Sequence, residues 1–139
     1  MVHNLKSKPQ ICSDSFHHRL VVITGATSGI GYATAKKYAS QGADLLLVNR
    51  NEQKSKALCE ALKNEFNANC NFTIAYFTQL SDIHSAAGKL SEMDRNIDVL
   101  IQNAGIYNTS SVLTGYQLEA VFQTNYLSTC ILNSSLREK

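Results

Sequence analysis

Short apolar runs alternate with longer amphipathic segments along most of this chain. The runs are rich in β-branched residues and too short to form helices, so each predicts a buried strand. The predicted strands are residues 20–23, 45–49, 71–77 and 97–103. The segments between them place apolar residues at helical spacing. The predicted helices are residues 29–40, 52–66, 81–93 and about 115–136.

Boundary signals support this alternation of strands and helices. Gly42 follows the first predicted helix and suits its C-terminal stop, whereas Ser81 is a good N-cap for the third. Strands that alternate with helices of about ten to fifteen residues are typical of βαβ units, with a parallel sheet covered on both faces. We therefore predict an α/β fold over residues 19–139, preceded by an irregular polar arm over residues 1–18.

The composition is that of one ordinary globular domain. The chain has 139 residues, of which 44% are hydrophobic and 17% charged, enough for a single core. Its net charge of +2 comes from scattered basic residues, which argues against a nucleic-acid partner. The polar arm lacks the apolar core of a signal peptide, and no apolar run is long enough to cross a membrane. Four cysteines without metal-binding spacing predict free thiols and a cytoplasmic location.

A glycine-rich loop, TGATSGIG at residues 24–31, joins the first predicted strand to the first predicted helix. Ligands of parallel sheets bind beyond the carboxyl ends of the strands, where this loop would lie. Its amides converge on a helix N-terminus, which carries partial positive charge and unpaired N–H donors. We expect Gly25 to allow the tight turn, Gly29 to let a pyrophosphate approach, and Gly31 to permit close packing. A turn that binds no ligand is the alternative.

The second predicted strand ends in Asn49 and Arg50, which follow the loop by about twenty residues. At this point of a dinucleotide fold, an acidic residue binds the ribose 2′-hydroxyl of NAD, whereas an arginine suits the 2′-phosphate of NADP. The acid is absent here, and a guanidinium pairs bidentately with phosphate and stacks on adenine. This favours NADP(H) over NAD(H), with an arginine that only faces solvent as the alternative.

Three motifs together resemble those of the short-chain dehydrogenase/reductase family. TGATSGIG resembles the family's TGxxxGxG cofactor motif, and QNAG, which begins at Gln102, resembles its NNAG motif. VFQTNYLS resembles the segment that carries the family's helix-borne Asn, here Asn125. The Asn-Arg ending of the second strand resembles the NADP-preferring branch, which includes retinol-dehydrogenase-like and related carbonyl reductases. The loop spacing disfavours the epimerase-like branch.

The resemblance implies a set of residues that bind NADP(H). Thr24 would order the loop and the strand ends, and Arg50 would bind the 2′-phosphate. The family has Asp-Leu where this chain has Gln79-Leu80, so the Gln79 carbonyl would accept the hydrogen bond from the adenine amino group. The complete implied set is Thr24, Gly25, Ser28, Gly29, Ile30, Gly31, Asn49, Arg50, Gln79, Leu80, Asn103, Ala104 and Gly105.

Asn125 lies three residues after Phe122 and four after Val121, so a helix places it on their apolar face. Burying an unpaired amide costs about 1–3 kcal/mol, and we therefore expect this side chain to have partners. The resemblance implies a catalytic role, in which Asn125 bends the helix and holds a water of a proton relay. An asparagine satisfied by backbone carbonyls is the alternative.

The family's catalytic Ser and Tyr-x-x-x-Lys pair follow on a further strand and helix, beyond those predicted here. The doubly wound order 3-2-1-4-5-6 would then reduce to a four-stranded Rossmann-type sheet in the order 3-2-1-4, with an apolar edge. We expect the N-terminal, cofactor-binding part of a longer NADP(H)-dependent oxidoreductase that acts on a small carbonyl or alcohol. A non-catalytic NADP(H)-binding form, or a dimer partner that associates through the last helix, is the alternative.

Overall fold

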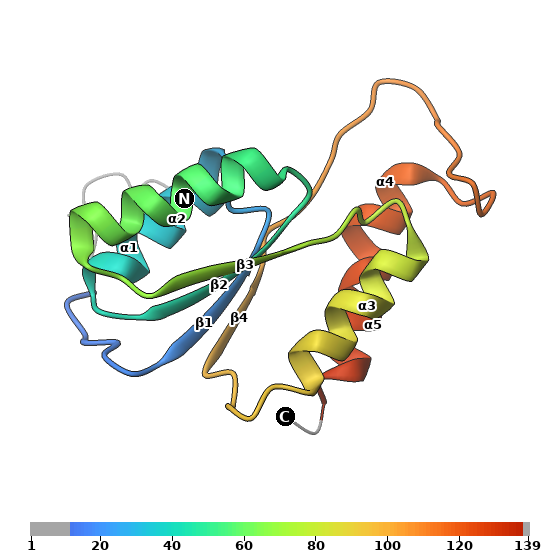
Figure 1. The fold of residues 1–139 in the computed structure, drawn as a ribbon. Helices are drawn as coiled ribbons and strands as arrows, with labels where there is room; N and C mark the ends of the chain where they lie inside the picture. The colour runs from blue at the N-terminus through green and yellow to red at the C-terminus, as the bar shows by residue number, and fades with distance from the viewer. Residues whose placement is uncertain (1–11, 138–139) are drawn as a thin grey trace, which may run out of the picture.

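A computed structural model describes residues 12–137 and shows a parallel sheet between two layers of helices (Figure 1). The strands are β1 (Leu20–Thr24), β2 (Asp44–Asn49), β3 (Cys70–Ile74) and β4 (Val99–Gln102). They lie in the order β3-β2-β1-β4, which confirms the predicted α/β fold and strand order. One face carries α1 (Gly29–Ser40) and α2 (Glu52–Phe66), and the other carries α3 (Leu80–Ser91) and α5 (Ser128–Ser135). Residues 1–11 of the predicted arm lie outside the described residues.

β1 is the central strand, and all five of its residues are buried. It pairs with β2 from Leu20 to Thr24 and with β4 from Val21 to Thr24. Alternate side chains of a strand point to opposite faces, so β1 contributes to two cores. Val21 and Ile23 pack beneath α1 and α2, whereas Leu20 and Val22 pack beneath α3 and α5.

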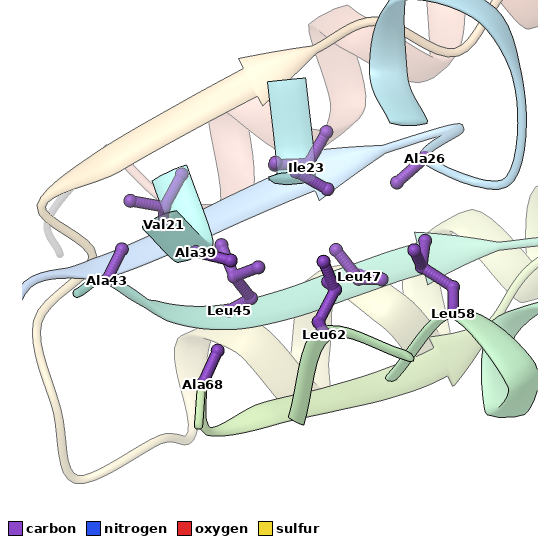
Figure 2. Close-up of a cluster of buried hydrophobic side chains, with 11 residues drawn as sticks. Val21, Ile23, Ala26, Ala39, Ala43, Leu45, Leu47, Leu58, Leu62 and Ala68 are labelled. Atoms are coloured by element: carbon purple, nitrogen blue, oxygen red, sulfur yellow. The ribbon is translucent and has the colours of Figure 1, made fainter. Parts of the chain in front are cut away.

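The core on the α1 and α2 face joins small and branched side chains (Figure 2). Val21 and Ile23 of β1 lie beside Leu45 and Leu47 of β2, and alanines of α1 approach the sheet closely. From α2, Leu58 and Leu62 cover the strands. The short side chains on α1 bring its N-terminus close to the carboxyl end of β1, where the glycine-rich loop connects them.

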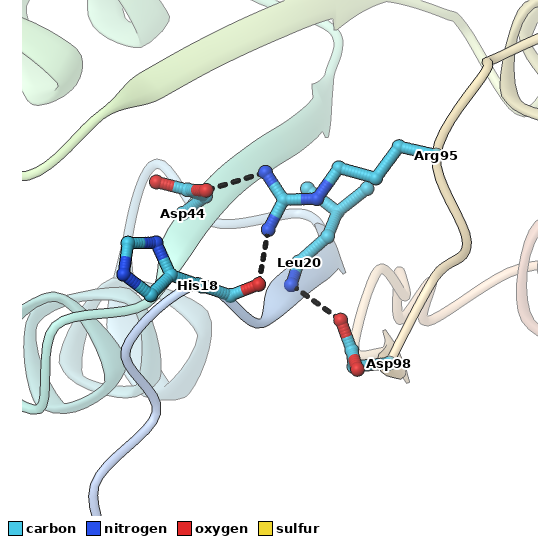
Figure 3. A network of polar contacts seen from close by, with 5 residues as sticks. All are labelled: His18, Leu20, Asp44, Arg95 and Asp98. Atoms are coloured by element: carbon cyan, nitrogen blue, oxygen red, sulfur yellow. Dashed lines mark hydrogen bonds and ion pairs between the residues drawn. The ribbon is translucent and has the colours of Figure 1, made fainter.

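A polar network holds the amino end of the sheet (Figure 3). The Arg95 guanidinium pairs with the Asp44 carboxylate at the start of β2 and donates to the carbonyl of His18 at 2.6 Å. The Asp98 carboxylate accepts a hydrogen bond from the backbone N–H of Leu20 at 2.7 Å. The segment between α3 and β4 is thereby tied to the first residues of β1 and β2.

Two predicted boundaries differ from the structure around α3. The third strand ends at Ile74 instead of residue 77, because its partner β2 ends at Asn49, which lies opposite Ile74. The N-cap of α3 is Gln79, so the prediction that Ser81 caps this helix is wrong. Ser81 already lies in the first turn of the helix, where its hydroxyl contacts the neighbouring Asp82 carboxylate.

The helix predicted over residues 115–136 begins later, at Ala120. The residues before it form a turn in which Gln117 adopts a positive φ of 57°. The Glu119 carboxylate then accepts hydrogen bonds from the next two free N–H groups and fixes the helix start there. The helical segments are α4 (Ala120–Phe122), the π-helical turn η2 (Gln123–Leu127) and α5. Within residues 12–137, no helix is both long and apolar enough to cross a membrane.

Candidate cofactor-binding site

A cavity of about 350 Å³ opens at the carboxyl ends of β1, β2, β3 and β4, beside the glycine-rich loop. This is where parallel sheets bind their ligands. The predicted site residues that line it are Gly25, Ser28, Ile30, Asn49, Arg50, Asn103, Ala104 and Gly105. Residues that the sequence analysis missed also line it: Thr27, Val48, Ala75, Tyr76, Phe77, Thr78, Ile106 and Thr124. The cavity therefore brings together the loop, the ends of all four strands and the turn after β3.

The loop conformation requires two of its glycines for different reasons. Gly25 has a positive φ of 68°, and a side chain there would place Cβ only 2.8 Å from the Cα atom of Ala104. A Cβ on Gly31 would lie 2.3 Å from the carbonyl oxygen of Gly25 and 2.5 Å from Nδ2 of Asn103. The first turn of α1 is thus packed directly on the loop and on the residues that follow β4.

Hydrogen bonds of Thr24 and Asn103 hold the loop against the end of β4. The Thr24 hydroxyl oxygen accepts hydrogen bonds from the backbone N–H groups of Asn103 and Ala104 at 3.1 and 3.0 Å. The Asn103 amide donates to the carbonyls of Thr24 and Gly25 at 3.2 and 2.9 Å. Thr24 is fully buried and does not line the cavity, so its role here is to position the loop.

Asn49 also holds the loop, although it lines the cavity. Its side chain is buried, and Oδ1 accepts from the N–H of Ala26 at 2.8 Å. Nδ2 donates to the hydroxyl of Ser55 on α2 at 3.0 Å. Because both ends of the amide are occupied, Asn49 fixes the distance between the loop and the start of α2.

The N-termini of α1 and α2 lie at the same edge of the sheet but differ in their capping. At α2, the Asn51 side chain accepts from the N–H of Lys54 at 2.8 Å, and Glu52 places a carboxylate in the first turn. At α1, the N-cap Ser28 makes no side-chain cap, and the first turn holds no acidic residue. The unpaired N–H groups and positive dipole end of α1 therefore face the cavity without a compensating group from the described chain.

Arg50 is the only charged residue among the described residues that line the cavity. Its side chain is exposed at the rim and makes no hydrogen bond or ion pair within residues 12–137. A cationic rim and an open helix N-terminus, without any carboxylate in the lining, favour an anionic ligand. The cavity thus fits the phosphates of a dinucleotide.

Gln79 and Leu80 do not line this cavity. Gln79 is exposed and caps α3, and Leu80 packs against the core on the α3 face. Thr78 and Phe77, which precede them, line the cavity instead. The adenine-binding role of Gln79 stays a prediction.

Comparison with known proteins identifies the chain. The sequence profile of the short chain dehydrogenase family matches residues 19–137. The chain belongs to this family. It is 30% identical to human retinol dehydrogenase 13 over 122 residues, which cover 87% of this chain and 37% of that protein. It is 32% identical to the WW domain-containing oxidoreductase of Drosophila melanogaster over 115 residues, which cover 81% of this chain and 28% of that protein.

Solved dehydrogenase structures share the fold. One is a short-chain dehydrogenase from Sphingobium yanoikuyae in complex with NADPH, with a TM-score of 0.76 and 31% identity; the match covers 85% of this chain and 46% of that one. Another is the bulky-bulky ketone specific alcohol dehydrogenase from Comamonas testosteroni, with a TM-score of 0.77 and 26% identity. That match covers 86% of this chain and 49% of the other chain. The chain spans about half the length of these solved relatives.

Asn125, the residue predicted to be catalytic, lies in the π-helical turn and does not line the cavity. Its Oδ1 accepts from the N–H of Ile106 at 2.8 Å, and its Nδ2 donates to the Ile106 carbonyl at 2.9 Å. The preceding Thr124 lines the cavity, and its buried hydroxyl has no hydrogen-bond partner among the described residues. Asn125 thus ties the last helix to the segment after β4, and Thr124 brings an unpaired polar group to the cavity.

One Tyr-x-x-x-Lys spacing occurs in the chain, at Tyr32 and Lys36, but both residues lie on α1, outside the cavity lining. Lys36 pairs with Glu65 of α2 at 2.8 Å and lies over the ring of Phe66. The hydrogen bond to Glu65 raises the pKa of Lys36 above its ordinary value. The Lys36–Glu65 ion pair therefore joins α1 to α2.

Proposed function

We propose that this chain forms the cofactor-binding part of an NADP(H)-dependent oxidoreductase, which transfers hydride between the nicotinamide and a small carbonyl or alcohol. The observation that carries the proposal is Arg50, the one charged side chain among the described residues that line the cavity. Family membership and the fit of the cavity to a dinucleotide support the nicotinamide cofactor.

The residues at the cavity divide the binding of NADP(H) between them. The pyrophosphate would lie at the open N-terminus of α1, close to Ser28 and Gly29, where N–H groups lack partners. Gly29 has a positive φ of 55°, and no atom lies within 4 Å of the place where its Cβ would be, so a ligand meets bare backbone there. Arg50 would bind the 2′-phosphate through its guanidinium, a contact that NAD(H) is unable to make.

The remaining chemistry requires groups that the family carries further along its chains. The bound nicotinamide supplies or accepts the hydride. In our proposal the Ser, Tyr and Lys that handle the proton belong to residues outside the sequence described here. Asn125 acts as a positioning residue for them, because its amide fixes the backbone of Ile106 at the cavity.

The proposal extends to assembly and location. Phe122 and Tyr126 of the last helical region are exposed, and their ring centroids lie 5.5 Å apart. An exposed aromatic pair of this kind suits a dimer interface. The four free cysteines are consistent with a reducing compartment such as the cytoplasm.

A binding titration of the Arg50→Ala variant tests the proposal. Loss of a charge-assisted hydrogen-bonded contact costs about 1.5–3 kcal/mol, which corresponds to a roughly tenfold to hundredfold weaker affinity for NADPH. The affinity for NADH should change by less than about twofold, because NADH lacks the 2′-phosphate. Cofactor fluorescence, measured with both nucleotides on the same preparation, provides the readout.

Lys56→Ala is the matched control, because Lys56 is an exposed cation on α2 that does not line the cavity. It removes the same formal charge and should leave both affinities unchanged. If Arg50→Ala and Lys56→Ala weakened NADPH binding equally, only the overall charge would matter and the assigned contact would be wrong. Equal affinity of the unaltered protein for NADPH and NADH would also contradict the proposal.

A further inference from the structure

Two cysteines from different elements come together on the α2 side of the sheet. Cys59 lies in the middle of α2, and Cys70 is the first residue of β3. Both side chains are partly buried against the core beneath α1 and α2. Both also line a second cavity, of about 470 Å³, which shares no lining residue with the cofactor-binding cavity. A small reagent in solvent thus has access to two adjacent thiols.

The two thiols line the same cavity and shift each other's pKa in opposite directions. The Cys70 thiol donates to the Cys59 sulfur, and this hydrogen bond lowers the pKa of Cys59. The same hydrogen bond, together with burial, raises the pKa of Cys70. One sulfur is therefore the better nucleophile, and the other stays protonated beside it. This asymmetry is that of an attacking and a resolving thiol.

We propose that Cys59 and Cys70 form a reversible disulfide by exchange with a low-molecular-weight disulfide of the glutathione type. Cys12 and Cys130 are exposed, and neither lines this cavity. Reversible disulfides in reducing compartments are usually catalytic or redox-sensing.

The exchange proceeds in two steps that balance. The Cys59 thiolate attacks one sulfur of the reagent, which forms a mixed disulfide and releases one glutathione thiolate. The Cys70 thiol then loses its proton to solvent, and its thiolate attacks the Cys59 sulfur, which releases the second glutathione thiolate. Two protein thiols are oxidised to one disulfide, and one molecule of glutathione disulfide is reduced to two thiols.

The bond would close the loop that turns from α2 into β3. Asn67 ends α2 in the left-handed conformation, with a φ of 53°, and its N–H bonds back to the Lys63 carbonyl. The turn is therefore already tight in the reduced protein. Joining Cys59 to Cys70 restrains the last turns of α2 against β3 without requiring a new fold of the chain.

Peptide mapping of the full-length protein tests the disulfide directly. Trypsin cleavage after lysines places Cys59 in the peptide of residues 57–63 and Cys70 in the peptide of residues 64–89. After incubation with glutathione disulfide and alkylation of the free thiols, we expect these two peptides to be joined. Dithiothreitol should separate them. Absence of the joined peptide, in samples where Cys12 and Cys130 carry glutathione, would overturn the proposal.

Variants separate the roles of the two sulfurs. In Cys70→Ser, Cys59 should accumulate as a stable mixed disulfide with glutathione, whereas in Cys59→Ser, Cys70 should stay free. Iodoacetamide should alkylate Cys59 of the unaltered protein at least about tenfold faster than Cys70, since the thiolate is the reactive form. This rate comparison needs no variant, so a variant that fails to fold does not remove the test. Equal alkylation rates, or glutathione on Cys70 alone, would contradict the assignment.

Discussion

The two ends of the sheet differ in whether their charged and polar groups have partners within the protein. At the amino end, Arg95 pairs with Asp44 and with the carbonyl of His18, and Asp98 accepts from Leu20 (Figure 3). At the carboxyl end, Arg50 has no partner among the described residues, and the N-terminus of α1 has no side-chain cap. Groups that already have partners hold the fold together. Groups that the chain leaves unpaired beside a cavity are those that a ligand is able to engage.

The same contrast separates neighbouring residues within the carboxyl end. Thr24, Asn49 and Asn103 lie at or just after the ends of strands, and their side chains pair with the loop, with α2 or with the end of β4. They position the proposed binding surface, which Arg50 and the N–H groups of α1 would form. Substitutions in the first group should lower stability and binding together, and substitutions in the second should change binding alone.

The largest effect is expected from Gly31→Ala. The new Cβ would lie 2.3 Å from the Gly25 carbonyl oxygen, so the loop has to move, at a cost of about 3 kcal/mol or more in the free energy of unfolding. NADPH binding should be lost with it, because the loop belongs to the proposed binding surface. Urea unfolding and an NADPH titration measure the two effects.

Gly88→Ala is the matched control for this substitution. Gly88 lies within α3, and no atom lies within 4 Å of the place where its Cβ would be. Alanine should therefore stabilise the helix by up to about 1 kcal/mol and leave NADPH affinity unchanged. If Gly31→Ala left both the free energy of unfolding and the NADPH affinity unchanged, the loop would tolerate a larger distance between residues 25 and 31 than the structure has.

An intermediate effect is expected from Thr24→Val. The change keeps the shape of the side chain but leaves the N–H groups of Asn103 and Ala104 without their acceptor. A buried donor without a partner costs about 1–3 kcal/mol. Thermal or urea unfolding should show this loss, and Thr24→Ser, which keeps the hydroxyl, should recover most of it. If both variants were equally stable, the hydroxyl would contribute nothing to the link between the loop and β4.

The smallest effect is expected at the amino end, from Arg95→Ala. The side chains of Arg95 and Asp44 are 39% and 25% exposed, so solvent screens their attraction. We expect a loss of no more than about 1 kcal/mol in urea unfolding, smaller still at high salt. NADPH affinity should not change. A clear loss of NADPH affinity would show that the two ends of the sheet are coupled. It would contradict the separation between an amino end that stabilises the fold and a carboxyl end that binds the ligand.

The sequence pattern predicts much of this fold because the determining signals are local. The helices at residues 29–40 and 52–66 have the predicted bounds, and the apolar runs coincide with the strand cores. Continuous apolar strands indicate a sheet that is covered on both faces, which is the arrangement observed. The sequence also places Arg50 and the glycine-rich loop at the carboxyl ends of strands, where the cavity lies, whereas their binding roles stay predictions.

The remaining features depend on contacts between distant residues. Ala75 to Phe77 are apolar but leave the sheet, because the neighbouring strand has already ended at Asn49. The start of the last helix is set by the Glu119 carboxylate, and no periodicity shows this cap. Asn49 looked like a cofactor ligand from its position, yet its amide binds Ala26 and Ser55. Nothing in the local pattern of Thr124 indicates that its hydroxyl is buried without a partner at the cavity.

The central position of β1 has a consequence for synthesis of the protein. β1 leaves the ribosome before the other described strands, yet its pairing with β4 joins residues far apart, as in the Leu20–Asp98 hydrogen bond beside it, which spans 78 residues. At about 5–20 residues per second, translation separates the two strands by roughly 4–16 s. During that interval the edge of β1 that pairs with β4 is left without its neighbouring strand. A nascent chain of this protein therefore presents a ready binding segment for chaperones at the ribosome exit.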